Sequence, residues 1–148
     1  MNGSVKFASR GDIEAILADG LREADLRELE SLGITPRESL ERGFDLSAPA
    51  MTVLVDGRPA GMFGVAPDPR FPQAGIIWFL GTDRLLGISR QFLRESQDWL
   101  SFLTGKYQVL ANAVHEDNEL HIKWLKWLGF TFLARRGPFI EFVRLSHV

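Results

Sequence analysis

The chain has 148 residues, of which 45% are hydrophobic and eleven are Phe, enough to bury the core of one domain. It contains no Cys, which excludes a disulfide scaffold, a Cys nucleophile and a Cys-ligated zinc site. The net charge of −2 gives no basic surface for nucleic acid. No apolar stretch approaches the roughly 20 residues of a membrane span, and residues 1–6 lack a secretion signal, so we expect a cytoplasmic protein.

The first third of the chain predicts one short strand followed by helices. Residues 5–8 favour a strand, and Asp12 has the position of an N-cap before a helix. A second helical region covers residues 24–32, ends at Gly33 and restarts at Thr35-Pro36. Gly43 and Pro49 are expected to close this helical part of the chain.

A β-hairpin is the clearest local pattern in the sequence. Residues 51–55 and 58–65 are two apolar strand-like segments joined by Asp56-Gly57, which is typical of a type I′ turn. The prolines that follow, Pro67, Pro69 and Pro72, predict a loop. Residues 75–80 form a continuous apolar run, as in a strand buried on both faces.

The second half alternates helical and extended patterns. Residues 87–105 predict a helix whose apolar face includes Ile88 and Phe92, and residues 108–114 predict a strand. Asn118 has the position of an N-cap for a helix that ends at Gly129, and a closing hairpin over residues 131–145 follows. The order β-α-α-β-β-β-α-β-α-β-β predicts an α/β protein, a mixed sheet with helices on both faces.

Two segments resemble signatures of the GCN5-related N-acetyltransferase (GNAT) superfamily. Asn118 and Leu128-Gly129-Phe130 fit its pattern of Asn-x-x-Ala, a spacer, Tyr and Leu-Gly-Phe. The stretch Arg84-Leu85-Leu86-Gly87-Ile88-Ser89 is similar to its (Arg/Gln)-x-x-Gly-x-(Gly/Ala) loop. More narrowly, residues 78–83 and the Asn118 helix look like the GNAT-like internal virion proteins of short-tailed phages. The resemblance implies one GNAT-like domain over residues 1–148, with a mostly antiparallel sheet of six to seven strands.

The resemblance also implies a site for acetyl-CoA. Backbone N–H groups of Gly87, Ile88 and Ser89 would bind its pyrophosphate at a helix N-terminus, with Leu80, Arg84 and Asn118 completing the set. The alternative is an ordinary helix that starts at Arg84 and is capped by Thr82 or Asp83, with no anion site.

Several residues differ from those expected in an active acetyltransferase of this superfamily. Leu125 stands where the superfamily has the Tyr that acts as general acid, and Leu cannot donate a proton. The strand over residues 75–82 has no titratable side chain, which leaves His115 and Glu116 as candidate bases. The alternative is that Asp117-Asn118-Glu119 is simply an acidic helix start, favoured by the helix dipole, with no catalytic role for the residues before it. Because no second His lies at metal-ligand spacing, no metal site is predicted.

His121 lies on the apolar side of its helix, where the superfamily pattern has Ala. It is either a hydrogen-bonded core histidine, a residue that intrudes on the cofactor, or a catalytic one. The four Trp residues are read as packing residues, with Trp127 at the edge of its apolar face and open to a protein contact.

Two functions remain from these observations. The first is a phage protein that acts in the virion or its assembly as a binding scaffold, with other virion proteins or copies of itself as partners. The second is an active acetyl-CoA-dependent N-acetyltransferase on an unknown amine. An enzyme would keep a groove near Leu80 and Val109, whereas a scaffold would fill it with Leu85, Leu86 and His121. The loss of Tyr at Leu125 favours the scaffold, in the host cytoplasm or in the virion.

Overall fold

A seven-stranded mixed sheet forms the centre of the computed structural model, which describes residues 3–87 and 89–145. The strand order is β1-β2-β3-β4-β5-β7-β6, with one parallel pair, β4 and β5, and antiparallel pairs elsewhere. The elements in chain order are β1 (Gly3–Phe7), α1 (Arg10–Asp19), α2 (Glu23–Leu32), α3 (Pro36–Leu46), β2 (Ala50–Val55), β3 (Arg58–Asp68), β4 (Phe71–Gly81), a 3₁₀ helix η1 (Asp83–Gly87), α4 (Ser89–Thr104), β5 (Val109–His115), α5 (Glu119–Trp127), β6 (Thr131–Arg136) and β7 (Phe139–Leu145).

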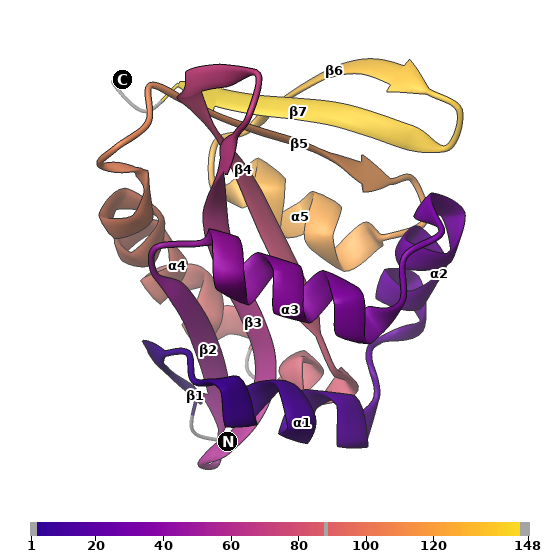
Figure 1. The fold of residues 1–148 in the computed structure, drawn as a ribbon, viewed down its shortest axis with the longest axis vertical. Helices are drawn as coiled ribbons and strands as arrows, with labels where there is room; N and C mark the ends of the chain where they lie inside the picture. The colour runs from indigo at the N-terminus through magenta and orange to yellow at the C-terminus, as the bar shows by residue number, and fades with distance from the viewer. Residues whose placement is uncertain (1–2, 88, 146–148) are drawn as a thin grey trace.

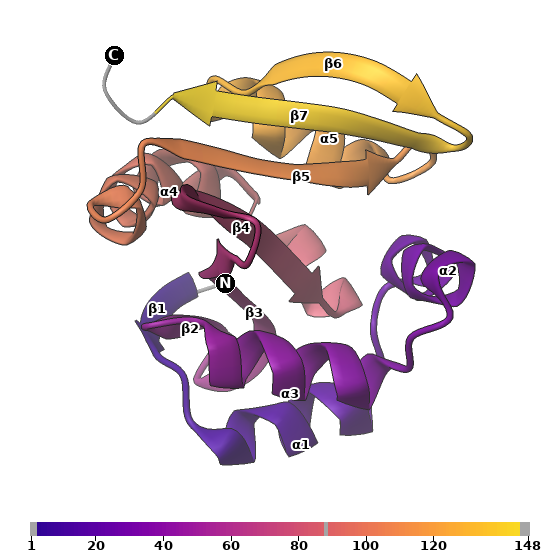
Figure 2. The ribbon, with the colours of Figure 1, turned by 45° about the horizontal axis from the view of Figure 1, so that its top comes forward.

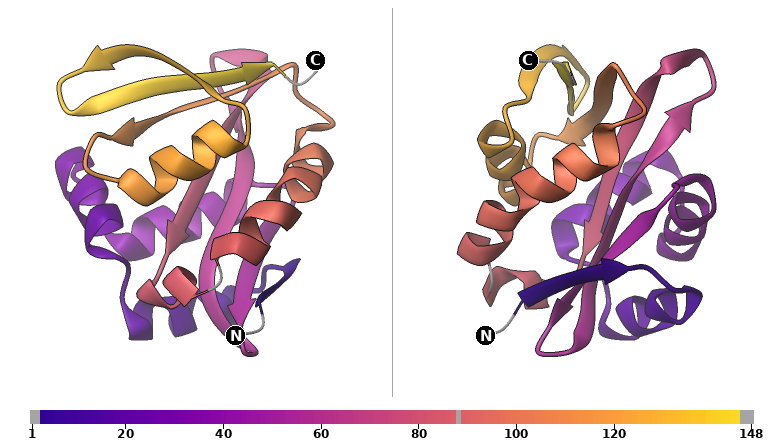
Figure 3. Two further views of the ribbon diagram at one scale, coloured as in Figure 1. Left: turned by 180° about the vertical axis from the view of Figure 1, so that it is seen from behind. Right: turned by 90° about the vertical axis from the view of Figure 1, so that its left-hand side faces the viewer.

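Helices cover both faces of the sheet, as the sequence predicted. Helices α1 and α3 lie on one face and α4 and α5 on the other, while α2 stands beside the end of β5 (Figures 1 and 2). The edge-on view separates these three layers most clearly (Figure 3). Each face has its own apolar core, one centred on residues such as Ile16, Leu40 and Met62, the other on residues such as Val53, Leu110 and Phe142.

The start of α1 corrects the predicted N-cap. The helix is capped at Ser9, and Asp12 lies at its third position, where its carboxylate accepts the Ser9 backbone N–H at 2.9 Å. The same carboxylate oxygen also accepts from Lys6 at 2.7 Å and from Thr52 at 2.8 Å. This arrangement is a capping box, in which the side chain of the third helical residue accepts the backbone N–H of the N-cap residue.

The structure confirms the hairpin turn predicted at Asp56-Gly57 but not the loop predicted from the prolines that follow. Asp56 and Gly57 both have positive φ, 50° and 80°, which confirms the type I′ hairpin turn. The predicted proline loop is wrong at two of its three prolines, because Pro67 lies in β3 and Pro72 in β4, and only Pro69 lies in the turn between these strands. This end of the β3–β4 hairpin extends past the paired parts of β2 and β5, so its prolines cost no hydrogen bonds to those neighbours.

Strands β4 and β5 pair over three positions only. The parallel pairing runs from Ala74–Val109 to Ile76–Ala111, after which the two strands diverge (Figure 1). The rest of β4 up to Phe79 is therefore only half-buried, and not buried on both faces as the apolar run predicted. We call the space between the diverging strands the β4–β5 split.

The region after β4 also differs from the prediction. The helix predicted over residues 87–105 corresponds to α4, which begins at Ser89. A separate 3₁₀ helix, η1, precedes it and includes Gly87. The predicted apolar face is confirmed at Phe92 and Leu100, which are buried, while Ile88 lies outside the described residues. Gly43, expected to close the helical part, lies inside α3. The second helical region is two helices, α2 and α3, which gives one helix more than the predicted order.

Helix termini predicted from glycine and proline are confirmed. Gly33 ends α2 with φ 69°, Thr35 caps α3 by accepting the Glu38 N–H at 3.1 Å, and Gly129 follows α5 with φ 85°. Among the described residues, no helix has the length and apolar character that a membrane crossing requires.

Candidate functional site

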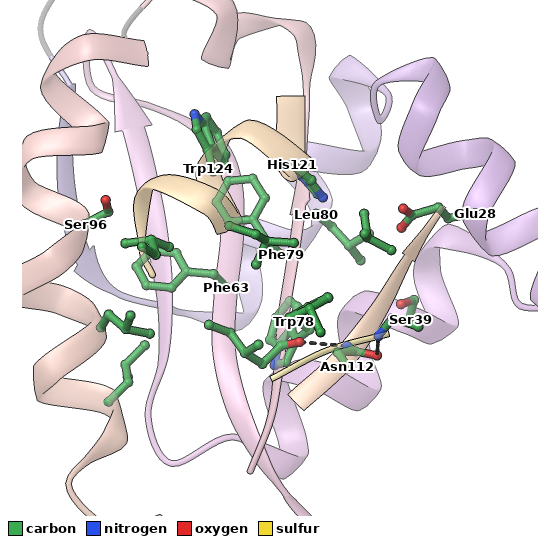
Figure 4. Close-up of a pocket in the computed structure, with 18 of the residues that line it drawn as sticks. Glu28, Ser39, Phe63, Trp78, Phe79, Leu80, Ser96, Asn112, His121 and Trp124 are labelled. Carbon is green, nitrogen blue, oxygen red and sulfur yellow. Dashed lines mark hydrogen bonds between the residues drawn. The ribbon is translucent and has the colours of Figure 1, made fainter. Parts of the chain in front are cut away.

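A pocket of about 220 Å³ opens at the β4–β5 split and reaches both faces of the sheet. Phe79 and Trp78 are neighbours on β4 whose side chains point to opposite faces, and both line it (Figure 4). Its wall is mostly apolar, and the titratable side chains in it are Glu28 and His121.

Aromatic rings form the wall on the side of α4 and α5. Phe79 packs edge-on against Trp124 at 5.1 Å between centroids and against His121 at 5.2 Å. Phe92 lies 4.7 Å from Trp124 and completes the wall. These edge-on and tilted contacts position the rings that form this side of the pocket.

Asn112 bridges the split near its narrow end. Its side-chain amide on β5 donates to the carbonyl oxygen of Ile77 on β4 at 2.7 Å, where the strands no longer pair directly (Figure 4). This bond replaces one rung of the missing ladder and sets the width of the split.

Helix α2 closes the wide end of the split by binding both strands. The Gly81 N–H at the end of β4 donates to Asp25 at 3.0 Å, and the Gly81 carbonyl accepts the Arg22 N–H at 2.8 Å. On β5, the His115 N–H donates to the Glu28 carboxylate at 2.8 Å. The backbone groups that the diverging strands expose at this end are thus satisfied by α2.

Asn118 is the centre of a buried polar cluster behind this closure. Its side chain does not cap α5, although the residue has the N-cap position that the sequence predicted. The amide oxygen accepts from Arg22 at 2.9 Å, and the amide nitrogen lies 3.0 Å from Asp25, 3.1 Å from Glu28 and 3.1 Å from His121. Asn118 and Asp25 are fully buried, so the cluster holds α2, α5 and β4 together.

Burial is the main cause of the pKa shifts of the two titratable groups in the pocket wall. It raises the pKa of Glu28, an effect that the nearby Asp25 charge reinforces and the hydrogen bonds from His115 and Asn118 oppose. Burial lowers the pKa of His121 to about 4, with Arg22 adding to the shift and Asp25 opposing it. At neutral pH the His121 ring is therefore uncharged.

The structure places the residues predicted to bind acetyl-CoA in different surroundings, and their role in binding stays a prediction. Leu80 lines it, but Asn118 is buried in the cluster, and Arg84 is paired with Asp19 at 2.9 Å on the surface. Gly87 is the exposed end of η1 and Ser89 begins α4. Ile88 lies outside the described residues. The Arg84 N–H is satisfied by the Thr82 hydroxyl at 3.3 Å, as in the alternative of a capped helix start.

The candidate bases point elsewhere. The His115 ring accepts the Asp117 N–H at 3.1 Å and packs against Phe139, and it is not part of the pocket wall. Glu116 is half-exposed and paired with Arg135 on β6. Their role as catalytic bases stays a prediction. Leu125 does line the pocket, so the position of the superfamily Tyr is occupied by a side chain without a proton to give.

Leu85, Leu86 and His121, the residues expected to fill the groove of a scaffold, lie in three different places. Leu85 is fully buried over Gly61 and Gly81, where it takes the space of a Cβ at Gly81, and it does not line the pocket. His121 lines the pocket, whereas Leu86 is 61% exposed.

Sequence reasoning missed the three residues that close the split: Arg22, Asp25 and Glu28. They lie in an ordinary acidic helix, more than 80 residues before their partners His115 and Asn118. No local pattern marks them, because charged residues on a short helix usually face solvent.

Comparison with solved structures shows that the chain has the GNAT fold. The GNAT domain of S. lividans PAT superimposes with a TM-score of 0.69 at 12% identity, covering 97% of this chain and 90% of that one. Spermidine N-acetyltransferase from Vibrio cholerae, solved with CoA and spermine, gives 0.65 at 13% identity, with coverages of 97% and 95%. A GNAT acetyltransferase from Streptococcus pneumoniae gives 0.61 at 16% identity, with coverages of 97% and 99%. At these identities the likeness concerns the fold alone.

A narrower match comes from a family model. The model of the bacteriophage T7 probable scaffold protein Gp13 matches residues 72–135, from the start of β4 to β6. This segment contains η1, α4, β5 and α5, and so most of the pocket wall. No curated protein matches the chain in sequence.

The residues around the split do not fit acetyl-CoA, the cofactor that the fold implies. Its long arm carries two amides that need hydrogen-bond partners within the gap between the strands, and the Gly81 edge there is occupied by α2. We therefore derive no reaction step through this cofactor.

Proposed function

We propose that this protein is a non-catalytic component of phage particle assembly, in which the GNAT fold serves as a rigid protein-binding module. Its partners would be other virion proteins or further copies of the chain, in the host cytoplasm or in the assembled particle. The observation that carries the proposal is the closure of the β4–β5 split by α2, on a chain whose β4–β6 segment matches the T7 probable scaffold family.

The engagement of the titratable groups at the pocket supports the same conclusion. Leu125 lines the wall at the position of the superfamily Tyr. Glu28 and His121 face the pocket, but both are hydrogen-bonded to the buried Asn118. A general base must reach its substrate proton within hydrogen-bond distance, and these two groups already serve the closure.

Calorimetric titration tests the non-catalytic half of the proposal. We expect no saturable binding of acetyl-CoA or CoA up to about 1 mM, with Vibrio cholerae spermidine N-acetyltransferase as the positive control. A thermal-shift series provides a second measurement, because a ligand at a hundred times its Kd would stabilise the fold by about 2.7 kcal/mol. Binding with a micromolar Kd would overturn the proposal and favour the alternative, an acetyltransferase on an unknown amine.

Genetic complementation tests the assembly half. An amber mutant of the phage gene should lose infectious particles, and the wild-type chain supplied from a plasmid should restore them. Gly87→Asp places a negative charge at the exposed end of η1, where a cofactor pyrophosphate would approach. We expect this variant to complement as well as the wild type. Failure of a folded Gly87→Asp chain to complement, or normal particle yield without the gene, would contradict the proposal.

A further inference from the structure

The strongest unexplained feature of the structure is a buried nitrogen without a partner. His121 is 8% exposed, and its Nε2 has no hydrogen-bond partner among the described residues. This atom points at Oδ1 of Asp25 from 3.6 Å, a distance too long for a hydrogen bond. A buried polar atom in this state carries a desolvation cost that a bound ligand would remove.

The Asn118 amide cannot serve every acceptor beside it. Its nitrogen lies within 3.1 Å of three acceptors, on Asp25, Glu28 and His121, but it has only two hydrogens. In this structure Arg22 orients the amide by donating to its oxygen at 2.9 Å. The two carboxylates have further donors, the His115 N–H for Glu28 and the Arg22 guanidinium for Asp25, so among the described residues His121 is the acceptor that depends on this amide alone.

The charge of the cluster points to a cation. Asp25 is paired with the guanidinium of Arg22, whereas Glu28 accepts hydrogen bonds from the uncharged His115 N–H and Asn118 amide. A negative charge on Glu28 therefore has no cationic partner among the described contacts of the cluster. Buried charges in proteins are paired or bind metal ions.

We propose that Asp25, Glu28 and His121 bind one divalent metal ion, for which zinc fits best. One ligand atom from each of the three lies within 4.8 Å of the others. Zinc takes nitrogen and carboxylate oxygen ligands at about 2.1 Å, so two ligands of a tetrahedral ion lie about 3.4 Å apart. The separation of 3.6 Å between His121 Nε2 and Asp25 Oδ1 is close to this value. Imidazole with two carboxylates favours zinc over magnesium or calcium.

The present contacts of the ligand atoms show what an ion would replace. Oδ2 of Asp25 accepts the Gly81 N–H, while Oδ1, which lies 3.6 Å from His121 Nε2, accepts from Asn118 at 3.0 Å and from Arg22 at 3.3 Å. Glu28 accepts the His115 and Asn118 N–H groups at Oε1, so its Oε2 is the atom offered to the ion. Glu28 and His121 also line the pocket, which provides the path of entry for the ion and a place for a water as the fourth ligand (Figure 4). Metal at Nε2 puts the ring proton on Nδ1, so the Asn118 amide would turn to present its oxygen there. This turn breaks the bond from Arg22 to the amide oxygen and releases Oδ1 of Asp25 from the amide nitrogen, which frees that oxygen for the ion.

The bound ion would be a structural one, joining α2 to α5 beside the closed end of the split. It would stabilise the closure that Asp25 and Glu28 already make with β4 and β5. The inference holds whether or not the chain binds acetyl-CoA, because none of its ligand atoms depends on the cofactor.

Zinc titration of tag-free protein, freed of metal with a chelator, tests the site. We expect one zinc ion per chain and a rise in Tm that a chelator reverses. His121→Gln and Glu28→Gln each remove one ligand and should lower the affinity at least tenfold, the lower end of what loss of a supporting contact costs. His115→Gln, which changes the other histidine beside α2, is the matched control and should bind like the wild type.

Nitrogen-15 NMR of the His121 ring gives a second measurement that a change in packing alone would not produce. In metal-free protein the proton should be on Nε2, because Nδ1 faces the Asn118 amide, and zinc should move it to Nδ1. Circular dichroism in chelator establishes that each variant is folded, and either folded ligand variant is sufficient. Zinc binding that neither variant weakens, no binding by the wild type, or a ring proton that stays on Nε2 would overturn the proposal.

Discussion

Arg22 and Asp25 form an ion pair from which water is almost entirely excluded, with side-chain exposures of 8% and 0%. Removing the guanidinium leaves the Asp25 carboxylate buried without a counter-charge, and it also removes the donor that orients Asn118. Breaking a buried pair from one side costs about 3–5 kcal/mol. We therefore expect Arg22→Ala to lower the free energy of unfolding by that amount, measured by urea denaturation in chelator.

The same helix offers a control for the charge itself. Arg27 pairs with Glu23 one turn apart, but both side chains are mostly exposed. Exposed pairs contribute about 0.2–1 kcal/mol, so Arg27→Ala should change stability little. Arg22→Lys keeps the charge but not the geometry of the guanidinium, and it should fall between the two. Equal stability of the Arg22→Ala and Arg27→Ala variants would show that the closure contributes nothing to folding.

At the scale of elements, Gly43 shows where a rule for isolated helices fails. A Cβ at this position of α3 would lie 2.6 Å from the ring of Trp78 on β4, and that ring is held by its hydrogen bond to Ser47 at 2.7 Å. Gly→Ala inside a helix normally stabilises by about 0.5–1 kcal/mol. Here the close approach of helix and strand reverses the sign, and we expect Gly43→Ala to destabilise by about 1–3 kcal/mol in thermal or urea unfolding.

Gly11 provides the matched substitution. It lies in α1, where an added Cβ would have no atom of another described residue within 4 Å, apart from its own helix and chain neighbours. Gly11→Ala should therefore leave the protein unchanged or make it slightly more stable. A Gly43→Ala variant that is as stable as Gly11→Ala would mean that Trp78 moves aside at little cost.

Elements with a local cause could be predicted from the sequence, and elements set by distant partners could not. Asp56-Gly57, Gly33 and Thr35-Pro36 act within a few residues, and the structure confirms each of them. The predicted start of α1 was wrong by three residues, because Ser9 and Asp12 both suit an N-cap. In the structure the Asp12 carboxylate accepts the Ser9 N–H and the hydroxyl of the distant Thr52, and Ser9 is the cap. The prolines of the β3–β4 hairpin were misread for a related reason, since their tolerance depends on which strands lie beside them.

For the whole molecule, the fold was easier to predict than the state of its site. The order of elements and the Asn118 and Gly87 motifs led to the GNAT fold, which the solved structures confirm. The same motifs implied that Asn118 approaches a cofactor, whereas it is buried against Arg22 and Asp25 from α2. A motif describes its own segment, and whether a site is open depends on what the rest of the chain places against it.

Amide hydrogen exchange tests whether the split stays closed in solution. The Gly81 N–H is bound by the buried Asp25, and the Arg22 N–H is bound by the Gly81 carbonyl, so both should exchange only when α2 detaches from β4. Because detachment separates a buried ion pair, we expect their protection to approach that of the central strands β2 and β3. Protection should fall in Arg22→Ala and remain in Arg27→Ala. Rapid exchange at Gly81 and Arg22 in the wild type, beside protected β2 and β3, would show that α2 opens as a lid. The Gly81 edge of β4 would then be accessible to a ligand, and its occupation by α2 would no longer argue against a bound cofactor.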